Sequence, residues 1–445
     1  MKESTVVALH KAGDTSEPSN YRPVSLTPII AKVMESIMHD NLLVHIENNQ
    51  LIHESQHGFR KNHSTTTNLI YFWNDITNYA NKKNEISIIY TDLRKAFDSV
   101  PHDLLLFKLS KLGIQNENFQ WFASFLENRQ QAVRINDSSS IPIHAASGVP
   151  QGGVLSGTLF NLFIGDMVHE LKYLKASLYA DDAKFYGPVH DSQSKLLIQE
   201  DINRVVDWCD RWRLRLNTSK CFFIHYRPPR STGDYPTYFI GEDELQRRQS
   251  GRDLGVTVSE NLKLHEQVQR ACKEATKQIN IIRRTFVSRN PEFLANMFKM
   301  HVRPKLEYCA PMWNPTYSGD IQRLEKVQNR FTRLLPNART MTPAERNRRL
   351  GITSHETRRL RGDLIHMFKL SHDTSLFPRC TDPRTRGHSK KLQVPRMNND
   401  LRKHSFAVRN VPTFLERSTR RNCKFREYCF KSRIDYFFSE NEMFV

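Results

Sequence analysis

Long apolar runs are missing from this 445-residue sequence, and their absence excludes one large class of protein. A helix that crosses a membrane needs about 18 or more consecutive apolar residues, and no such stretch is present. The opening residues MKESTVVALHKAGD also lack the apolar core of a signal peptide. We therefore expect an intracellular protein that works in the nucleus, the cytoplasm or both, is not secreted and has no membrane partner.

Cysteine is scarce, and its spacing excludes two further classes of protein. No Cys-x-x-Cys pair occurs, so the sequence predicts neither a disulfide framework nor a zinc ribbon. Cys423 and Cys429 are too weak a pair to indicate a terminal zinc knuckle. We expect reduced thiols at all seven positions, which are 209, 221, 272, 309, 380, 423 and 429.

Acidic residues are scarce in one part of the chain only. Residues 261–445 contain 38 Lys and Arg against 17 Asp and Glu, a net charge of +21, whereas residues 1–260 contain 28 against 30, a net charge of −2. Such a field attracts a polyanion, and nucleic acid is the usual one. The alternatives are plain solubility and an acidic membrane surface, for which no basic amphipathic helix with an aromatic face stands out. We favour nucleic acid.

The rest of the composition is ordinary for a globular protein, with 38% hydrophobic and 10% aromatic residues. The length allows two or three domains, and strand-like segments alternate with helical ones. A helix is predicted to begin near Pro101 and to end at Gly113. Residues 27–49 have helical apolar spacing, and we expect this stripe to face the core: Ile30, Val33, Met34, Ile37, Leu42 and Ile46.

Three aspartates occupy positions that favour more than simple solvation. The stretch KASLYADDAKFYG (175–187) places Asp181 and Asp182 between two short strand-forming runs, which predicts a hairpin tip. Asp92 follows the apolar run of EISIIYTDLRKAFDSV (85–100), which is typical of a buried strand. Acidic turns are common, so two solvated turn residues are the alternative interpretation of the pair.

If both elements belong to one sheet, the three carboxylates can meet. Adjacent like charges repel each other unless a cation neutralises them. A cluster of acidic oxygens suits two magnesium ions that bridge substrate phosphates, one activating an attacking hydroxyl and the other steadying the leaving oxygen. This arrangement indicates phosphoryl transfer, which depends mainly on positioning and on charge neutralisation.

Seven segments, in order along the chain, resemble the motifs of one family. They are NYRPVSLTPIIAKVMESIM (20–38), HGFRKNHSTTTNLI (57–70), YTDLRKAFDSV (90–100), SGVPQGGVLSGTLF (147–160), YADD (179–182), LNTSK (216–220) and RDLGVTVSENLKLHEQVQRA (252–271). The family is the reverse transcriptase of non-LTR retrotransposons, of the LINE type and Jockey-like. Residues 301–333 also resemble the region that follows the thumb in these elements, so the resemblance covers nearly the whole chain.

The resemblance implies an α+β fold, the right-hand polymerase, with fingers, a palm whose antiparallel sheet packs on helices, and a mainly helical thumb. Fingers and palm would span residues 1–255, the thumb and the following helical region 256–340, and a basic C-terminal region 341–445. The implied function is that of an RNA-directed DNA polymerase, which extends a DNA primer on an RNA template with deoxynucleoside triphosphates. The implied cofactor is a pair of Mg²⁺ ions, with Mn²⁺ as an alternative.

The resemblance also implies roles for single residues. Asp92, Asp181 and Asp182 would be the catalytic carboxylates that hold the metal ions. Phe97 would lie beneath the incoming sugar and reject a 2′-hydroxyl, the alternative being an ordinary core aromatic. The other implied substrate-binding residues are Arg22, Lys32 and Arg60 around the triphosphate, Gln151 and Gly152 on the nascent base pair, and Lys220 as proton donor to pyrophosphate. Template contacts, surface ion pairs or simple solvation are the alternatives for these cations.

A basic helix is predicted in LKLHEQVQRACKEATKQINIIRRT (262–285). Its apolar stripe consists of Val268, Cys272, Ala275, Ile279 and Ile282. The predicted nucleic-acid-binding residues lie elsewhere on its surface and are Arg270, Lys273, Lys277, Arg283 and Arg284. A thumb helix of this kind would hold a template–primer duplex by its shape and phosphates, although a merely solvated basic helix is the alternative.

The sequence departs from the family pattern in three ways. Complete elements carry an upstream endonuclease, which this sequence does not contain, so a separate endonuclease is a candidate partner. Glycine stands at 153 and 157, where the family usually has serine and proline, and no zinc knuckle is evident. The rival interpretation is therefore an inactive or co-opted remnant that binds RNA or template–primer without polymerising. A two-metal nucleotide cyclase or nuclease lacks support from the fingers and thumb motifs.

Overall fold

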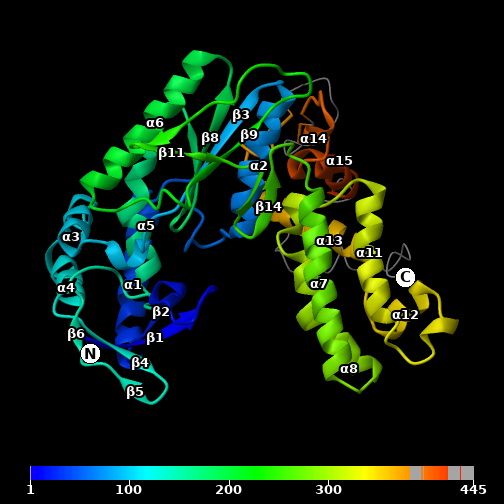
Figure 1. Ribbon diagram of the computed structural model, residues 1–445, viewed down its shortest axis with the longest axis horizontal. Coiled ribbons are helices and arrows are strands. Elements are labelled where there is room, and N and C mark those ends of the chain that lie inside the picture. The colour runs from blue at the N-terminus through cyan, green and yellow to red at the C-terminus, as the bar shows by residue number, and fades with distance from the viewer. Residues whose placement is uncertain (1, 381–391, 394, 419–430, 432–445) are drawn as a thin grey trace. The chain divides into compact units, whose positions relative to one another are not determined.

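The computed structural model describes residues 2–380, 392–393, 395–418 and 431 (Figure 1). These residues form two compact units. The first draws on residues 1–68, 87–225 and 232–248, and the second on 69–86, 226–231 and 249–445. Helices and sheets occur together, which confirms the α+β class. Within the described residues, every helix is too short or too polar to cross a bilayer.

The first unit is built on a central five-stranded sheet. Its strands lie in the order β12 (Gln246–Arg247), β9 (Phe222–Tyr226), β3 (Glu85–Thr91), β8 (Asp182–Val189) and β7 (Lys175–Tyr179). The five middle residues of β3 are all buried, as the apolar run predicts. Strands β7 and β8 pair antiparallel, whereas β12 pairs with β9 in parallel, so the expected antiparallel sheet is mixed at one edge.

Helices supply the core on which this sheet packs. The buried cluster takes in apolar residues of the central strands, of α1 (Ile29–Asn49) and of four further helices, of which α5 is buried along its whole length. The predicted helix that ends at Gly113 is present, with Pro101 as its N-cap and Gly113 at φ +85°. The four further helices are α3 (His102–Lys111), α4 (Asn116–Leu126), α5 (Ser156–Ile164) and α6 (Ser192–Arg211).

A second sheet of the first unit joins the N-terminus to the segment after α4. Strand β1 pairs antiparallel with β2 and parallel with β4, and β4 pairs antiparallel with both β5 and β6. The strands are β1 (Glu3–His10), β2 (Tyr21–Leu26), β4 (Gln130–Ile135), β5 (Ser138–Ser139) and β6 (Ile143–His144). Short elements complete the unit: η1 (Pro18–Asn20), η2 (Ala96–Ser99), η3 (Gly165–Glu170), β10 (Phe239–Ile240) and β11 (Asp243–Glu244).

The prediction for helix α1 (Ile29–Asn49) is wrong in its first half, where the apolar side chains face solvent and a carboxylate faces the core. Ile30 and Ile37 are 67% and 56% exposed, whereas Glu35 is only 1% exposed. The Glu35 carboxylate accepts hydrogen bonds from the backbone N–H groups of Val154, at 2.7 Å, and Leu155, at 3.3 Å. Amides just before a helix lack acceptors within the helix, so α5 draws the carboxylate inward. Only the second half of α1 meets the prediction, through buried Leu42 and Ile46.

The second unit is mainly helical, as the resemblance implies. Its long helix α7 (His265–Thr285) is followed by a bundle of shorter ones, and a hairpin of β13 (Ser250–Asp253) and β14 (Val256–Ser259) precedes it. The other elements are α2 (Thr65–Asn81), α8 (Pro291–Met297), the π-helix η4 (Phe298–Val302), α9 (Arg303–Glu307), α10 (Ala310–Trp313), α11 (Ser318–Thr332), η5 (Ala338–Thr340), α12 (Pro343–Arg349), α13 (His355–Leu370), α14 (Asp400–Lys403) and α15 (Phe406–Ser418).

Helix α2 packs with residues far away in sequence. Ile70 joins a buried apolar cluster with residues of α13 and α15 and of the segment between them, among them Met367 and Phe406. The buried Arg402 guanidinium donates to the backbone oxygen of Asn74, at 2.9 Å, and to Thr77 Oγ1, at 3.2 Å. Part of the fingers motif 57–70 is thus continuous with a helix that the C-terminal region covers.

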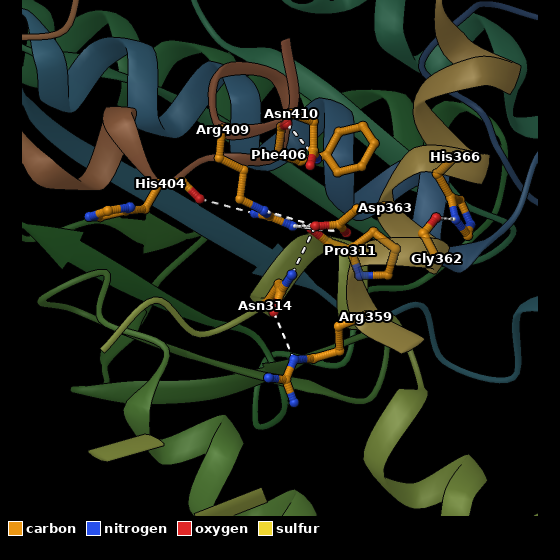
Figure 2. Close-up of polar contacts among 10 residues, drawn as sticks. All are labelled: Pro311, Asn314, Arg359, Gly362, Asp363, His366, His404, Phe406, Arg409 and Asn410. Carbon is orange, nitrogen blue, oxygen red and sulfur yellow. Dashed lines mark hydrogen bonds and ion pairs between the residues drawn. The ribbon is translucent and has the colours of Figure 1, made fainter. Parts of the chain in front are cut away.

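A buried ion pair joins three helices of the second unit (Figure 2). Arg409 of α15 donates through Nε to Asp363 Oδ2 of α13, at 3.0 Å, and through Nη2 to Oδ1, at 3.1 Å. The same guanidinium donates to the backbone oxygens of Pro311 and His404. Asn314, just after α10, donates to Asp363 Oδ2 at 2.9 Å. The described part of the C-terminal region is therefore an integral part of this unit.

Candidate active site

The central sheet brings Asp92 and Asp181 to the same place. Strands β3 and β8 are neighbours, and Thr91 Oγ1 donates to the backbone oxygen of Ala183 at 3.2 Å. In the β7–β8 hairpin Tyr179 pairs with Asp182, so the predicted tip is a two-residue turn of Ala180 and Asp181. Asp92 follows the last residue of β3, which puts it beside this turn.

The Asp181 carboxylate is influenced both by burial and by the charge of Asp92. Burial raises the pKa of Asp181, and the negative charge of Asp92 raises it further. A hydrogen bond from its own backbone N–H and the positive charges of Arg22 and Lys11 act in the opposite direction. Two carboxylates held together in this way favour a bound cation, because the cation removes their mutual repulsion.

A single amide side chain holds the turn that carries Asp181. Ala180 has a left-handed φ of +55°, which is strained for a residue with a side chain. Its backbone N–H donates to Gln56 Oε1 at 2.9 Å, and Gln56 Nε2 donates back to its carbonyl at 3.4 Å. Gly58 lies against the same peptide, since a Cβ on it would come within 2.4 Å of the Ala180 nitrogen. Sequence reasoning did not single out Gln56, although it directly precedes the motif that begins at His57.

The loop after α6 holds Asp92. The Asn217 N–H donates to the backbone oxygen of Asp92 at 2.8 Å, and the Asp92 N–H donates to Cys221 Sγ at 3.4 Å. Lys220 Nζ lies 3.5 Å from Asp92 Oδ2. Both side chains of this ion pair are well exposed, so it adds little to stability. The contact nevertheless places the Lys220 ammonium directly beside the Asp92 carboxylate.

The third predicted carboxylate, Asp182, is the exposed first residue of β8. Across the residues that the structure describes, no three His, Cys, Asp or Glu side chains form a group that could hold a metal ion. The arrangement nevertheless fits Mg²⁺, because this ion is commonly held by one or two carboxylates together with water and substrate phosphates. Asp92 and Asp181 supply such a pair of hard oxygen ligands.

The glycine-dense loop before α5 lies on the segment that follows Asp92. The Val149 N–H donates to the Phe97 carbonyl at 2.8 Å, and Gln151 Nε2 donates to Asp98 Oδ1 at 3.4 Å. Gly152 has φ +113°, and a Cβ there would lie 2.9 Å from the Ser25 oxygen, so only glycine fits. This loop helps to line a cavity of about 330 Å³, whose walls include Lys95, Asp98, Arg129 and Gln151.

Phe97 lies in a small group of aromatic rings. Its ring stacks on that of Phe160 with 4.4 Å between centroids and 15° between planes. Phe59 meets it edge-on at 6.0 Å and 75°. Phe160 is fully buried in α5, so Phe97 is fixed against a rigid support.

The three cations that were predicted to bind the triphosphate differ in their contacts. Arg22 acts on Asp181 electrostatically, and so does Lys11, which sequence reasoning missed because nothing marks the turn between β1 and β2 as part of the site. Arg60 is half-buried and donates to the backbone oxygens of His53, at 3.0 Å, and Gln56, at 3.1 Å, which ties it to its own loop. Among the described residues, the Lys32 side chain makes no hydrogen bond or ion pair.

The predicted nucleic-acid-binding residues all lie on α7 of the second unit (Figure 1). The helix buries most of the predicted stripe, with Cys272 only half-buried. Arg270 donates to the Gly255 oxygen at 3.0 Å, and Lys277 pairs with Glu274 at 2.9 Å. Among the described residues, Lys273, Arg283 and Arg284 are exposed and make no hydrogen bond or ion pair.

The sequence of this chain matches a family of known proteins. The family described as "Reverse transcriptase (RNA-dependent DNA polymerase)" matches residues 9–281. The chain is 29% identical over 347 residues to "Probable RNA-directed DNA polymerase from transposon X-element" of Drosophila melanogaster, covering 75% of this chain and 37% of that protein. It is 27% identical over 353 residues to "RNA-directed DNA polymerase from mobile element jockey" of the same organism, covering 76% and 38%. The chain thus spans little more than a third of the length of these curated relatives.

Solved structures show a weaker similarity. The structure of telomerase from Candida tropicalis in complex with a telomeric RNA fragment matches with a TM-score of 0.47 and 11% sequence identity, over 98% of this chain and 64% of that one. The apo form of the same telomerase matches with a TM-score of 0.47 and 10% identity, over 93% and 65%.

Proposed function

This chain belongs to the reverse transcriptase (RNA-dependent DNA polymerase) family, and from this premise we propose that it extends a DNA primer on an RNA template with deoxynucleoside triphosphates. The observation that carries the proposal is the placement of Asp92 beside Asp181, with Arg22 and Lys11 within electrostatic reach. A pair of carboxylates next to a group of cations suits a metal–triphosphate complex, which presents both charges at once.

Asp92 and Asp181 would hold the metal, with Asp182 as the third carboxylate. We propose two Mg²⁺ ions, with Mn²⁺ as the alternative. When bound, such ions activate the primer hydroxyl and neutralise charge on the phosphates. Support comes from the family, whose enzymes use divalent metals, and from the raised pKa of Asp181, which has burial as its main cause and the Asp92 charge as a further one, since a bound cation would offset both.

The other predicted residues take supporting roles in this proposal. Arg22 and Lys11 offset the charge of the triphosphate, and Lys32 and Arg60 border its path. Phe97 lies beneath the sugar and excludes a 2′-hydroxyl. Gln151 and Gly152 contact the nascent base pair, while Lys220 gives a proton to the departing pyrophosphate, a role supported by its position next to Asp92.

The second unit would hold the nucleic acid. We propose that Lys273, Arg283 and Arg284 contact phosphates of the template–primer duplex, while Arg270 and Lys277 act mainly within their own helix and hairpin. In functional terms we keep the division into fingers and palm (1–255), thumb region (256–340) and basic C-terminal region (341–445), which differs from the two packing units. A nuclear or cytoplasmic location and a separate endonuclease partner are part of the same proposal.

The proposal predicts that Asp181→Asn abolishes primer extension. The amide keeps the size of the side chain but loses the metal-binding charge, so incorporation should fall at least about a thousandfold. The measurement is Mg²⁺-dependent extension of a DNA primer on an RNA template by the purified protein. Asp137→Asn, in the exposed turn between β4 and β5, is the matched control and should retain extension within about twofold.

Two outcomes would contradict the proposal. Equal extension by Asp181→Asn would remove the metal assignment. Tight binding of template–primer by the unsubstituted protein, with no incorporation in Mg²⁺ or Mn²⁺, would favour the rival interpretation, a retrotransposon remnant that binds without polymerising.

A further inference from the structure

Phe59 has an unusual setting for a large aromatic residue. It is 56% exposed and has a left-handed φ of +51°, so it gains little from burial and carries backbone strain. A phenylalanine in such a conformation persists only where the surrounding structure holds it. Its neighbour Gly58 provides that hold, because the Gly58 oxygen accepts from Asn161 Nδ2 of α5 at 2.7 Å.

The first turn of α5 is shaped to fit the Phe59 ring. A Cβ added to Gly157 would lie 2.4 Å from Cγ of Phe59 and 2.5 Å from Cδ1, closer than real Cβ contacts allow. The glycine therefore leaves a flat surface on α5 against which the exposed ring lies.

From that surface the Phe59 ring reaches Phe97. Phe97 has Phe160 against one face, at 15° between planes, and the edge contact with Phe59 at 75°. The two supports differ in kind, because Phe160 is a core residue of α5, whereas Phe59 belongs to the loop that also clamps the Ala180 turn. The position of the Phe97 ring is thereby tied to the turn that carries Asp181.

We propose that Phe59 is a positioning residue for sugar selection: it stops the Phe97 ring from moving off Phe160, and Gly157 is the position that makes room for this stop. The inference rests on the proposed function, in which Phe97 excludes nucleotides with a 2′-hydroxyl. Phe59 acts through Phe97 and not on the nucleotide itself, so its effect requires Phe97 to be present.

The test measures discrimination, the ratio of kcat/KM for a deoxynucleotide to that for the matching ribonucleotide, in primer extension on RNA. Phe59→Ala should lower this ratio about two- to tenfold, the factor that corresponds to one edge-to-face aromatic contact. Phe107→Ala, on α3, is the matched control, since Phe107 is a similarly exposed phenylalanine at 52% whose nearest ring is Trp212. It should leave the ratio unchanged.

Two double variants separate positioning from general damage. Phe59→Ala should lower the ratio in the presence of Phe97 and have no further effect in the Phe97→Ala background. Gly157→Ala should lower the ratio in the native background, because its Cβ displaces the Phe59 ring, and should have no effect once Phe59→Ala has removed that ring. A merely structural role would not produce this dependence on a second residue.

Each of these results either supports or overturns the proposed role of Phe59. An unchanged ratio in Phe59→Ala, or an equal fall with and without Phe97, would overturn the inference while leaving the proposed function standing. Absence of deoxynucleotide incorporation by the unsubstituted protein would overturn the proposed function, and the inference with it.

Discussion

At the residue scale, the site is assembled from groups that would each be unfavourable alone. Ala180 accepts a left-handed backbone, Asp181 is held near a like charge, and both depend on the Gln56 amide. Strain of this kind costs about 1–3 kcal/mol per residue and persists where neighbours fix the conformation. The cost is consistent with a site whose purpose is to hold charge in one place.

Lys108, which lies away from the site, is another charged group that is held in an unfavourable environment by its neighbours. Its ammonium is almost fully buried on α3, lies 3.6 Å from the Trp212 ring centroid and donates to Asp166 Oδ1 at 2.6 Å. Burial lowers the pKa of Lys108 to about 8, although Asp166 acts in the opposite direction. The aromatic rings and the carboxylate thus offset only part of the desolvation of the charge.

The lowered pKa predicts how stability changes with pH. Between about 8 and the ordinary value of 10.5, the unfolded chain binds a proton at Lys108 that the folded chain does not, so unfolding becomes harder as pH rises. The gain should be on the order of 3 kcal/mol across this window. Urea unfolding followed by circular dichroism at pH 7.5 and pH 10.5 measures it.

Lys108→Met should lack this gain, because the titrating group is gone. Lys172→Met, which removes an exposed lysine of the same unit, should keep it. The same pH dependence in both variants would show that Lys108 is not the source.

At the scale of elements, apolar spacing predicts the buried face of one helix correctly and that of another incorrectly. Helix α7 buries Val268, Ala275, Ile279 and Ile282 as its spacing indicates. Helix α1 has similar apolar spacing, yet it exposes Ile30 and buries Glu35. The difference is the neighbour, because α5 offers unpaired amides that only an acceptor can satisfy.

The polar contacts of α7 predict which of its cations bind nucleic acid. Replacing Lys273, Arg283 and Arg284 together by Gln should remove about three phosphate contacts. The slope of log K against log salt for a template–primer duplex should then become less steep by about 2 to 3. Fluorescence anisotropy at 50–200 mM salt measures this slope.

The control is a variant that loses the same amount of positive charge elsewhere in the second unit. The triple variant Lys82→Gln, Lys83→Gln and Arg230→Gln changes three exposed cations outside α7 and should leave the slope nearly unchanged. If both triples lowered it equally, the basic region would act only through its overall field.

At the scale of the whole molecule, the two packing units do not follow the order of the chain. The C-terminal part of α2 belongs to the second unit, where Arg402 and the cluster around Ile70 hold it. The basic C-terminal region had no assigned role in the sequence, but its described residues complete the core of this unit. The Arg409–Asp363 pair is a buried connection that fixes it, with side chains 12% and 3% exposed.

Breaking this pair should destabilise the second unit. Arg409→Met leaves Asp363 buried with Asn314 as its remaining donor, at a cost of about 3–5 kcal/mol. Thermal unfolding should shift down by several degrees, and trypsin should cut at Arg402 and Lys403 sooner than in the unsubstituted protein.

Lys299→Met is the control for the Arg409 variant, since this lysine of the same unit is exposed and leaves both cleavage sites intact. Asp363→Leu combined with Arg409→Met should cost less than the sum of the two single variants, because no charge is left unpaired. Additive losses would show that the pair is not coupled.

Much of the site can be predicted from local pattern. The hairpin around Asp181, the buried strand before Asp92 and the start and end of α3 each depend on a few consecutive residues, and the structure confirms all three, although Asp182 lies in β8 and not in the predicted tip. Gln56, Lys11 and the contact of Phe59 with Gly157 could not be found in this way. Each joins segments that are far apart in sequence, and no local signal marks either partner.

By itself the sequence determined the chemistry available to this protein: three carboxylates in an ordered set of motifs, and a net positive charge that comes from residues 261–445. These properties depend only on which residues are present and on their order in the chain, so they can be recognised without knowing the fold. Only the tertiary structure decided which carboxylates lie side by side, which way α1 faces and which helices the C-terminal region completes. Those outcomes depend on long-range contacts, in which burial and hydrogen bonding with distant partners outweigh the preferences of any single segment.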